Sequence, residues 1–444
     1  MMSPQAKEEE EEEETRVAWH RGKYWRIAGK YYDFTPFMDR HPGGRTLLEI
    51  ARDAYDDSTF AFEAHHTNYM LVRKMLPKYE VKLTATEKAA HKAAERRTKK
   101  HPYPRKLIPE DSFYSVLRSN VRRHLSRNGG SGPTKECLFL FFICAIGYSV
   151  SFGLMYYSGN LVCSCCAALF GGLLGGFAHS WVHQPKFKTY AYAMDFIGLS
   201  SDGWLQEHVL QHHMYTNSPL DNHFEGTAPF LVTDPTVRRN LIQCYLTPFI
   251  NVLLLQFGIW ANHAKHLASV AQGSEELRLL PKSLLWVQTL LLVTRWGIIH
   301  GLLLMHVTLG LIGIWFFSVA LLNHNSEKSY EAVLSSNKNV VDWAHAQLIA
   351  CSDFEPNTGV YGSMKYLWLN YHTVHHLFPH VDLSKHAAVQ TVLIDTIDTW
   401  NHGHPSRPIR YESHKSVWNL YREMITSFRF PRHPGAMLRL YPGI

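Results

Sequence analysis

The sequence predicts a small soluble α+β domain followed by an α-helical, polytopic membrane domain with four transmembrane helices and further helices in the cytosol. Three observations support this fold class. Residues 17–82 combine short β-type runs with turn signals. Two apolar stretches, Leu138–Ala178 and Ser283–Asn323, contain a single charged residue between them, Arg295. The chain has 28 histidines among 444 residues, and many of them cluster where the apolar stretches end.

Residues 1–16 contain an unbroken acidic run, Glu8 to Glu14, with no apolar face. Because like charges at this density repel one another, we expect a disordered tail. No apolar signal-peptide core precedes or follows the run, so nothing argues for secretion. Of the seven cysteines, five lie within or beside apolar segments, as expected for small apolar residues in a reducing compartment.

Residues 17–82 are predicted to form the soluble domain. Short β-type runs are broken by turns at Gly22 and Gly29. The segment "FMDRHPGGRTLLEIARDA" then predicts a turn followed by an amphipathic helix.

The turn in this domain is "HPGG", which begins at His41. Pro42 fixes the chain there, and the two glycines permit a tight backbone. A second histidine follows in "AFEAHH", at His65 or His66. Two axial histidines fill both free positions of a heme iron and leave it only electron transfer. The domain is therefore expected to bind heme.

Residues 83–134 are expected to be a basic linker. From Lys92 to Arg127 the chain has eleven lysines and arginines against three acidic residues. The segment can be a solvated connector, a contact with an anionic membrane face, or both.

Residues 135–400 are expected to form the membrane domain. Each apolar stretch has 41 residues, enough for two passes, with turns near "YYSGN" at 156–160 and near "IIHG" at 298–301. Residues 246–260 are too short to span and are expected to be interfacial or re-entrant.

Two such hairpins place all their ends on one side of the membrane. The flanks on that side carry lysines and arginines, namely Arg122, Arg123, Lys135, Lys186 and Lys188, whereas the "YYSGN" turn carries none. The positive-inside rule then places both termini, the loop 179–282 and the C-terminal tail 401–444 in the cytosol.

Histidine clusters occur at the same ends of the predicted spans. The three clusters are "HSWVH" (His179, His183), "HVLQHH" (His208, His212, His213) and "HTVHH" (His372, His375, His376), and His324 follows the fourth span. Ionisable residues are rare at membrane depth and are usually functional there. These clusters therefore predict a site on the cytosolic face.

The spacing within the clusters favours metal binding. Residues four apart share a helix face, so each i,i+4 pair, such as His208 and His212, is expected to point two imidazoles at one point. The adjacent His213 and His375 are expected to reach a second point nearby. Nine imidazoles suit two metal ions with room for oxygen, although imidazole alone does not select the metal. The isolated histidines His263, His266, His300, His306, His380 and His386 are better explained as structural, and His223 is intermediate.

These motifs resemble two known families. The segment "WRIAGKYYDFTPFMDRHPGG" is similar to the heme-binding signature of cytochrome b5 domains. The segments "GLSSDGWLQEHVLQHHMYTN", "DWAHAQLIACSDF" and "NYHTVHHLFP" resemble the second and third blocks of front-end membrane fatty acid desaturases, in the branch fused to cytochrome b5. The combination is also similar to animal cytochrome b5-related proteins.

The resemblance implies heme b, a non-heme di-iron site, dioxygen as co-substrate, and an endoplasmic reticulum membrane protein that receives electrons from NADH through a cytochrome b5 reductase. It implies a heme held by His41 and a second histidine, for which we prefer His66 to His65 because it lies four residues after Phe62. The iron ligands that it implies are His179, His183, His208, His212, His213, His372, His375 and His376, with His324 as a further match.

Two positions depart from the family pattern. The first box commonly begins His-Asp and here reads His179-Ser180, which removes a carboxylate that could orient the ligand. The third box of front-end enzymes commonly opens with Gln and here opens with His372, so the regioselectivity associated with Gln does not transfer.

The reaction that the resemblance implies is desaturation of a lipid acyl chain. Such a reaction needs an oxidant supplied by a cofactor, because no side-chain acid or base can break an unactivated C–H bond. Trp181 and Trp204 could line the acyl passage. A lipid hydroxylase on the same site is an alternative, as is an electron carrier with an inactive desaturase part. A zinc-dependent membrane hydrolase is the most remote alternative, because such an enzyme would not need a heme domain. Membrane lipids and a reductase are expected partners, and nucleic acid is not. Chain length, double-bond position, acyl carrier and oligomeric state stay open.

Overall fold

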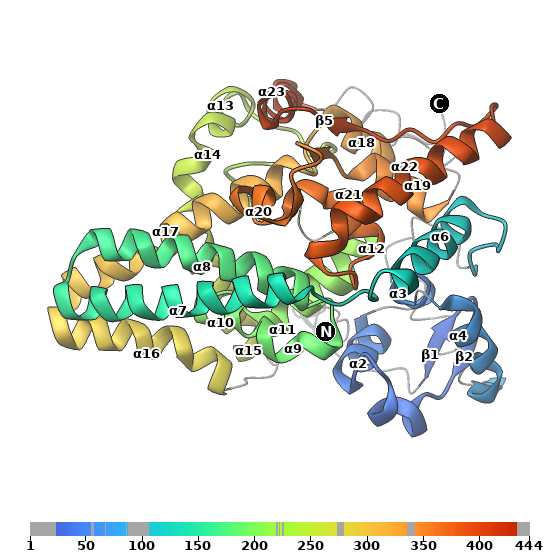
Figure 1. Cartoon of the computed structure of the whole chain (residues 1–444), viewed down its shortest axis with the longest axis horizontal. Helices are drawn as coiled ribbons and strands as arrows, with labels where there is room; N and C mark the ends of the chain where they lie inside the picture. Colours follow the sequence, from blue (N-terminus) through green and yellow to red (C-terminus); the bar gives the residue numbers. More distant parts are fainter. Residues whose placement is uncertain are drawn as a thin grey trace, which may run out of the picture. The chain divides into compact units, whose positions relative to one another are not determined.

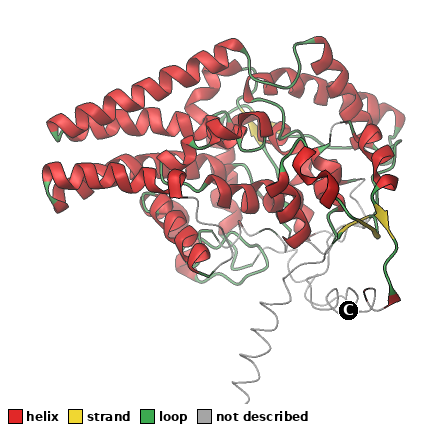
Figure 2. Ribbon diagram, turned by 90° about the horizontal axis from the view of Figure 1, so that it is seen from below, coloured by secondary structure: helices red, strands yellow, loops and turns green. Residues whose placement is uncertain are grey.

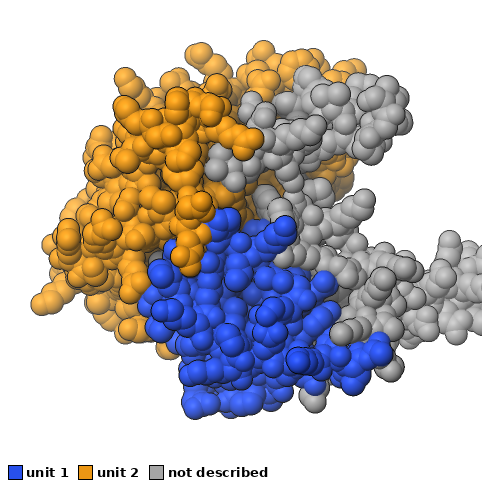
Figure 3. Space-filling model, turned by 90° about the vertical axis from the view of Figure 1, so that its right-hand side faces the viewer, with its two compact units in different colours: residues 1–109 blue, residues 110–444 orange. Residues whose placement is uncertain are grey.

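The computed structural model describes residues 24–54, 57–66, 68–85, 87, 106–218, 221, 223, 226–272, 279–334 and 342–432. The chain divides into two units, residues 1–109 and 110–444, which Figure 3 shows in blue and orange. The acidic run Glu8–Glu14, the turn at Gly22 and the end of the chain after residue 432 lie outside the described residues.

A three-stranded antiparallel sheet forms one side of the first unit. Its strands are β1 (Trp25–Ile27), β2 (Lys30–Tyr32) and β3 (Glu80–Val81), in the order β1-β2-β3. The turn between the first two strands falls where the sequence predicts it, with φ of 77° at Gly29. Alternating side chains of β1 and β2 reach an apolar core made of Trp25, Ile27, Tyr32, Phe34, Met38, Phe62 and Leu76.

Short helices complete the first unit. They are η1 (Thr35–Arg40), α2 (Arg45–Ala54), α3 (Thr59–His65), α4 (Tyr69–Met75) and η2 (Leu76–Lys78). The helix α2 follows "HPGG" directly, so the predicted turn and helix are confirmed. Within the unit, the buried carboxylate of Glu63 pairs with Arg73 at 2.6 Å and ties α3 to α4. The predicted small α+β fold is confirmed.

The second unit begins with a helix where the sequence predicts a linker. Residues 113–127 form α6 (Phe113–Arg127), whose N-cap is Ser112. Phe113, Leu117 and Val121 of this helix are fully buried, and α6 packs against α22. The expected linker 83–134 is therefore wrong for this part. An apolar stripe at helical spacing outweighs the basic composition on which the expectation depended.

The first predicted membrane hairpin is confirmed. The helices α7 (Lys135–Ser158) and α8 (Leu161–Trp181) pack along each other and are joined at Gly159, whose φ is 63°. This joint lies inside the predicted turn 156–160. A side chain at Gly159 would also meet the indole of Trp296 at 3.0 Å, so both backbone freedom and space favour glycine there.

The second hairpin differs in detail from the prediction. It consists of α16 (Leu279–Trp296) and α17 (Ile298–Leu322), joined at Gly297, just before the expected "IIHG" turn. Among the described residues, only α7, α8 and α17 are long and apolar enough to cross a membrane. The predicted fourth span is thus not supported by length and composition, because α16 includes Lys282, Gln288 and Arg295. It nevertheless packs along α17, and the four long helices lie side by side (Figures 1 and 2).

Many short helices follow the first hairpin. They are η3 (Pro185–Phe187), α9 (Lys188–Ala191), α10 (Ala193–Phe196), α11 (Ser201–Trp204), η4 (Leu205–His212), α12 (His213–Tyr215), α13 (Leu241–Tyr245), α14 (Thr247–Leu255) and α15 (Gly258–Ala271). As expected, the segment 246–260 forms no span. It is split between α14 and α15, and its Phe249, Leu253 and Phe257 are exposed.

The remaining elements follow α17. They are α18 (Glu327–Leu334), α19 (Trp343–Ala350), β4 (Asp353–Phe354), α20 (Gly359–Ser363), η7 (Met364–Tyr366), η8 (Leu369–Tyr371), α21 (His372–Leu377), η9 (Leu383–Lys385), α22 (His386–Gly403), β5 (Ser413–His414) and α23 (Val417–Phe428). The described part of the expected tail 401–444 is folded. Its β5 pairs in parallel with β4, and Leu420 and Phe428 of α23 are fully buried in a core cluster.

Candidate metal centre

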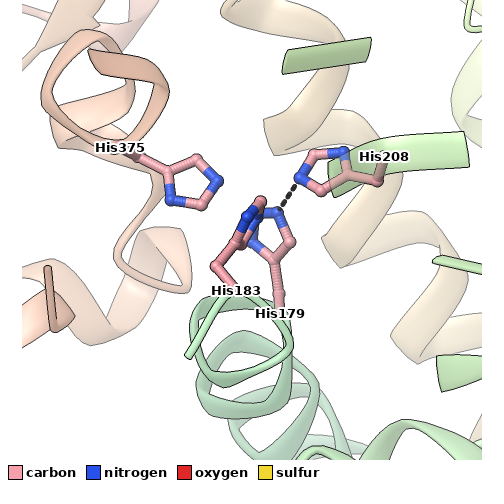
Figure 4. A group of neighbouring side chains, drawn as sticks. All are labelled: His179, His183, His208 and His375. Atoms are coloured by element: carbon pink, nitrogen blue, oxygen red, sulfur yellow. Dashed lines mark hydrogen bonds between the residues drawn. The ribbon is translucent and has the colours of Figure 1, made fainter. Parts of the chain in front are cut away.

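Four histidines from three separate segments form a first group. His179 lies in the last turn of α8, His183 just after it, His208 in η4 and His375 in α21. Their ring nitrogens lie within 4.8 Å of one another, and all four residues are buried. The Nε2 atoms of His179 and His208 are 2.6 Å apart. Figure 4 shows the four rings directed toward a shared space.

A second group consists of His212, His324, His372 and His376, whose ring nitrogens also lie within 4.8 Å of one another. Their Nε2 atoms form a chain of short separations. His212 and His324 are 3.1 Å apart, His324 and His372 are 2.7 Å apart, and His372 and His376 are 3.2 Å apart. His324, which belongs to none of the three clusters, is thus a full member of this group.

His213 lies between the two groups. Its Nε2 is 3.0 Å from Nε2 of His208, and its ring lies 4.4 Å from that of His183. On the other side its ring stacks on His376 at 4.0 Å. The two groups are therefore neighbours, and all nine predicted histidines are brought together.

The predicted pairing of His208 with His212 is found only in a third possible group, which the two histidines form with His223; in the two four-histidine groups they are separated. Residues 205–212 form a π-helix rather than an α-helix. In a π-helix the hydrogen bonds run from i to i+5, so residues five apart share a face. His208 therefore lies beside His213, and His212 turns toward the second group. In the third cluster the α-helical expectation is confirmed, since His372 and His376 share a group and His375 faces the other.

The tautomers in the second group fit a cation. Nδ1 of His212 lies 2.9 Å from Asp221 Oδ2, that of His324 lies 3.2 Å from the Ala350 carbonyl, and that of His376 lies 3.1 Å from Gln347 Oε1. Each of these oxygens can accept a hydrogen bond from Nδ1–H, and in that tautomer Nε2 carries the lone pair. Nε2 of these three histidines is then available to bind a cation.

The distances agree with metal ligation. Two nitrogens that each lie about 2.0–2.1 Å from one ion and subtend a right angle are about 3 Å apart. The observed Nε2 separations, 2.6 to 3.2 Å, are of this size. In the first group, Nε2 of His375 has no hydrogen-bond partner among the described residues. A buried nitrogen of this kind is expected where an ion would bind.

Burial also keeps these side chains neutral. It lowers the pKa of His212 and of His324 to about 3. It lowers the pKa of His213, His372 and His376 well below the usual value, and neighbouring imidazoles add to the shift. Neutral imidazole is the form that binds metal, so no proton needs to be removed at neutral pH.

Sequence reasoning missed the residues that orient the ligands. Asp221 accepts hydrogen bonds from His212 and from the backbone N–H groups of Asn217 and His223. Gln347 and Thr216 contact Nδ1 of His376. Such partners fix the tautomer and the ring direction of a metal ligand. Asp221 could have been suspected from its position in the sequence, because it lies only nine residues after His212.

The other histidines differ in their relation to the site. His223 stacks on the ring of His212 at 3.9 Å and forms a third possible grouping with His208 and His212. By contrast, Nε2 of His300 contacts the Gly159 carbonyl at 2.8 Å, in the joint between α7 and α8. His263, His266, His306, His380 and His386 belong to none of the metal-binding groups found among the described residues.

A separate acidic group lies near the end of the chain. Glu412, His414 and Glu423 also bring possible ligand atoms together. The ammonium group of Lys328 lies 3.3 Å from Glu412, and Nδ1 of His414 lies 3.6 Å from Glu423. Each carboxylate therefore has a basic partner within the protein.

The first box retains a nearby carboxylate despite its unusual second residue. Ser180 stands where the family has Asp, and its side chain is buried. The next residue, Trp181, donates from Nε1 to Asp382 Oδ2 at 2.7 Å. Asp382 lies on the loop after α21, so this bond ties the first box to the segment that follows the third.

In the first unit, His41 faces His66. Their ring centres are 6.0 Å apart, and an iron between two imidazoles at about 2 Å from each nitrogen separates the ring centres by about 6 Å. Nδ1 of His66 contacts the Phe62 carbonyl at 2.7 Å, which leaves Nε2 as the ligand atom. A Cβ at Gly43 would lie 2.8 Å from the His41 ring, so the third residue of "HPGG" makes room for that ring.

Comparison with known proteins agrees with these two sites. The profile of the family "Fatty acid desaturase" matches residues 157–405, more than half of the chain. The chain belongs to the fatty acid desaturase family. The profile "Cytochrome b5-like Heme/Steroid binding domain" matches residues 9–82, so this member of the family carries a fused cytochrome b5 domain, and that domain implies heme.

Several curated relatives match over most of their length. The "Cytochrome b5-related protein" of Drosophila melanogaster is 27% identical over 95% of this chain and 94% of its own. The "Probable Delta(5) fatty acid desaturase C" of Dictyostelium discoideum is 24% identical over 88% and 89%. The "Acyl-lipid (8-3)-desaturase" of Physcomitrium patens is 25% identical over 89% and 85%.

Proposed function

We propose that this desaturase introduces a double bond into a lipid acyl chain at a di-iron site, using dioxygen and electrons from its own heme domain. The observation that supports the proposal most strongly is the adjacency of two buried histidine groups. Each group offers four imidazoles within 4.8 Å of one another, and His213 lies between them. Two neighbouring all-nitrogen sites suit a pair of iron ions that act together.

The proposed ligands divide between the two irons. His179, His183, His208, His213 and His375 hold one ion, and His212, His324, His372 and His376 hold the other. When bound, the irons supply the oxidant that an unactivated C–H bond requires. The protein supplies neutral ligands, their orientation, and a buried site from which water is excluded.

Trp204 is the better candidate of the two tryptophans for contact with the acyl chain. Its ring lies 5.0 Å from that of His208 and 6.0 Å from that of His179. Trp181, in contrast, is fully buried and packs on Phe141 and Phe177 in the core. An aromatic wall beside the ligands would fix which methylenes approach the irons, since position decides which bond reacts.

We further propose that electrons pass from NADH through a cytochrome b5 reductase to the fused heme. Tethering the donor raises its effective concentration at the acceptor. Lysines and arginines flank the ends of the predicted spans at which the histidines cluster. By the positive-inside rule these ends, the active site and both termini face the cytosol. The family resemblance implies that the membrane is that of the endoplasmic reticulum.

Expression in yeast tests the proposal. Fatty acids and sphingoid bases from cells with wild-type protein are compared by mass spectrometry with those from His376→Ala cells. We expect a product two mass units lighter than its precursor only with wild type, and an unchanged heme spectrum in both proteins. A product that gains oxygen instead would establish a hydroxylase. Turnover by His376→Ala would refute the ligand assignment, and a wild type without bound iron would indicate an electron carrier.

A further inference from the structure

The segment after α22 folds back onto the candidate metal centre. Residues 413–414 form β5, which pairs in parallel with β4, so that Asp353 lies opposite Ser413 and Phe354 opposite His414. Two residues before β5 stands Tyr411. It lies beyond residue 405, where the family match ends, and outside every histidine cluster.

Tyr411 contacts a fully buried carboxylate. Its hydroxyl donates to Asp353 Oδ2 at 2.7 Å, and Asp353 has 0% exposure. Gln390 of α22 donates from Nε2 to the same Asp353 oxygen at 3.0 Å and to the Tyr411 hydroxyl at 2.6 Å. The three side chains thus form a closed network, and a carboxylate so deeply buried depends on its donors.

The other oxygen of Asp353 holds the third histidine cluster. The backbone N–H of Thr373 donates to Asp353 Oδ1 at 2.6 Å. Thr373 is the second residue of α21, between His372 and His375, so this bond sets the position of the first turn of that helix. A carboxylate also suits the N-terminal end of a helix.

The residues just before Asp353 hold His324, another member of the second group. The Ala350 carbonyl accepts from Nδ1 of His324 at 3.2 Å, and the Ser352 N–H donates to the Asn323 carbonyl at 2.9 Å. The segment 350–353 therefore bridges the end of α17 and the start of α21. Its placement sets the distance between His324 and His372, whose Nε2 atoms are 2.7 Å apart.

We infer that Tyr411 is a positioning residue of the metal centre, acting through Asp353 to hold α21 in register with His324. The inference rests on the proposed function, because it takes these histidines as ligands. Tyr411 is not proposed to contact any of these histidines. Its hydroxyl acts through the carboxylate of Asp353. Loss of a group that hydrogen-bonds a metal ligand directly typically weakens metal binding about 10- to 100-fold. Tyr411 acts further from the ligands, through Asp353, so we expect an effect at the lower end of that range.

Tyr411→Phe in the full-length, heme-loaded and iron-loaded protein tests the inference. Iron retention is measured against increasing chelator, together with the thermal unfolding midpoint and the heme spectrum. We expect up to about 10-fold weaker iron retention than in wild type, with the heme spectrum unchanged and kcat lowered more than KM is raised. Tyr421→Phe is the matched control, because Tyr421 is a half-buried tyrosine of α23 that packs against the apolar cluster.

Gln390→Leu provides a second variant that removes the other donor to the same Asp353 oxygen. We expect iron retention to fall in the same direction, and the two changes together to be less than additive, since they act on one network. Wild-type iron retention in both single variants would overturn the inference. The inference would also be overturned if Tyr421→Phe lost as much iron as Tyr411→Phe and both variants had an equally lowered unfolding midpoint. Tyr411 would then contribute only to general stability. A wild type that binds no iron would instead refute the proposed function.

Discussion

In several histidines of this site, the two nitrogens of one ring face different partners. His212, His324 and His376 each direct Nδ1 at an oxygen of the protein, namely Asp221, the Ala350 carbonyl and Gln347. The oxygens select the tautomer, and the tautomer leaves Nε2 free to bind an ion. The position of a buried oxygen thus decides whether a histidine can serve as a ligand, which sequence spacing alone does not reveal.

His324 provides a test at this scale, because it stands outside the three clusters. Its Nε2 lies between those of His212 and His372, at 3.1 and 2.7 Å. We expect His324→Ala to lower bound iron from two ions per chain toward one, because the second group loses a central ligand. Metal analysis of purified protein measures this, alongside the heme absorbance, which should not change.

The control for this change is His306→Ala. His306 lies in α17, 18 residues earlier in the chain, and its ring stacks on Phe257 rather than on another histidine. Its replacement should leave the iron content at the wild-type value. Equal iron in His324→Ala and wild type would show that His324 is not a ligand.

At the scale of the element, helix type determines which histidines meet. The π-helix Leu205–His212 places His208 beside His213 and sends His212 to the other group. A regular α-helix would have directed His208 and His212 at one point. Similarly, α6 is a packed helix in a region that was expected from its charge to be a linker, and α23 is a packed helix in the expected tail, because a buried apolar face decides the structure.

The loop between α12 and α13 depends on a buried arginine. Arg239 has 2% exposure, and Nε donates to the Val232 carbonyl at 2.8 Å. Its other guanidinium nitrogens contact carbonyls of the same loop and of the end of α23, including Thr233 and Ser427. The guanidinium thereby joins two segments that are almost 200 residues apart in sequence.

We expect Arg239→Met to destabilise the second unit by about 1–3 kcal/mol, because several buried carbonyls lose their donor. The thermal unfolding midpoint of the full-length protein in detergent should fall accordingly. The adjacent Arg238 is exposed, and Arg238→Met should leave the midpoint unchanged. If the two variants unfolded at the same temperature, the buried network would contribute no net stability.

At the scale of the whole molecule, one chain combines a cytochrome b5 domain with a buried histidine centre, which we propose act as two redox sites. The first unit brings His41 to His66 with ring centres 6.0 Å apart, and the second unit brings nine histidines together. A heme with two axial histidines transfers electrons and does not bind oxygen. Covalent linkage supplies each acceptor with its own donor at high effective concentration.

If the first unit transfers electrons and the second carries out the reaction, the effect of His41→Ala can be predicted. The heme iron loses an axial ligand, so the heme absorbance should disappear and NADH-driven desaturation should stop. The iron content of the second unit should stay at the wild-type value. Spectra, metal analysis and product formation measure the three results on one preparation.

His65→Ala is the matched control, because His65 is adjacent to His66 in the sequence, whereas it is the ring of His66 that faces His41. This variant should keep the heme absorbance. Wild-type desaturation by His41→Ala with no added electron carrier would contradict the proposed role of the fused heme, since a separate cytochrome b5 in the membrane would then suffice.

The sequence by itself determined the features that depend on local patterns. A run without charge predicts a span, "HPGG" predicts a tight turn beside a heme ligand, and clustered imidazoles predict a metal site. These patterns are short, so neighbouring residues suffice to define them. Eight of the nine proposed iron ligands lie in such clusters, and the two halves of the fold follow from patterns of the same kind. His324 was expected only from its place after the fourth predicted span and from the family resemblance.

Only the tertiary structure decided how the ligands are shared and held. The split of His208 from His212 depends on a π-helix that spacing rules do not anticipate. The roles of Asp353 and Tyr411 depend on hydrogen bonds between separate segments, and Tyr411 is 58 residues from the carboxylate it contacts. Such bonds form only when the chain has buried both partners, and their energy therefore comes from the fold rather than from the local sequence.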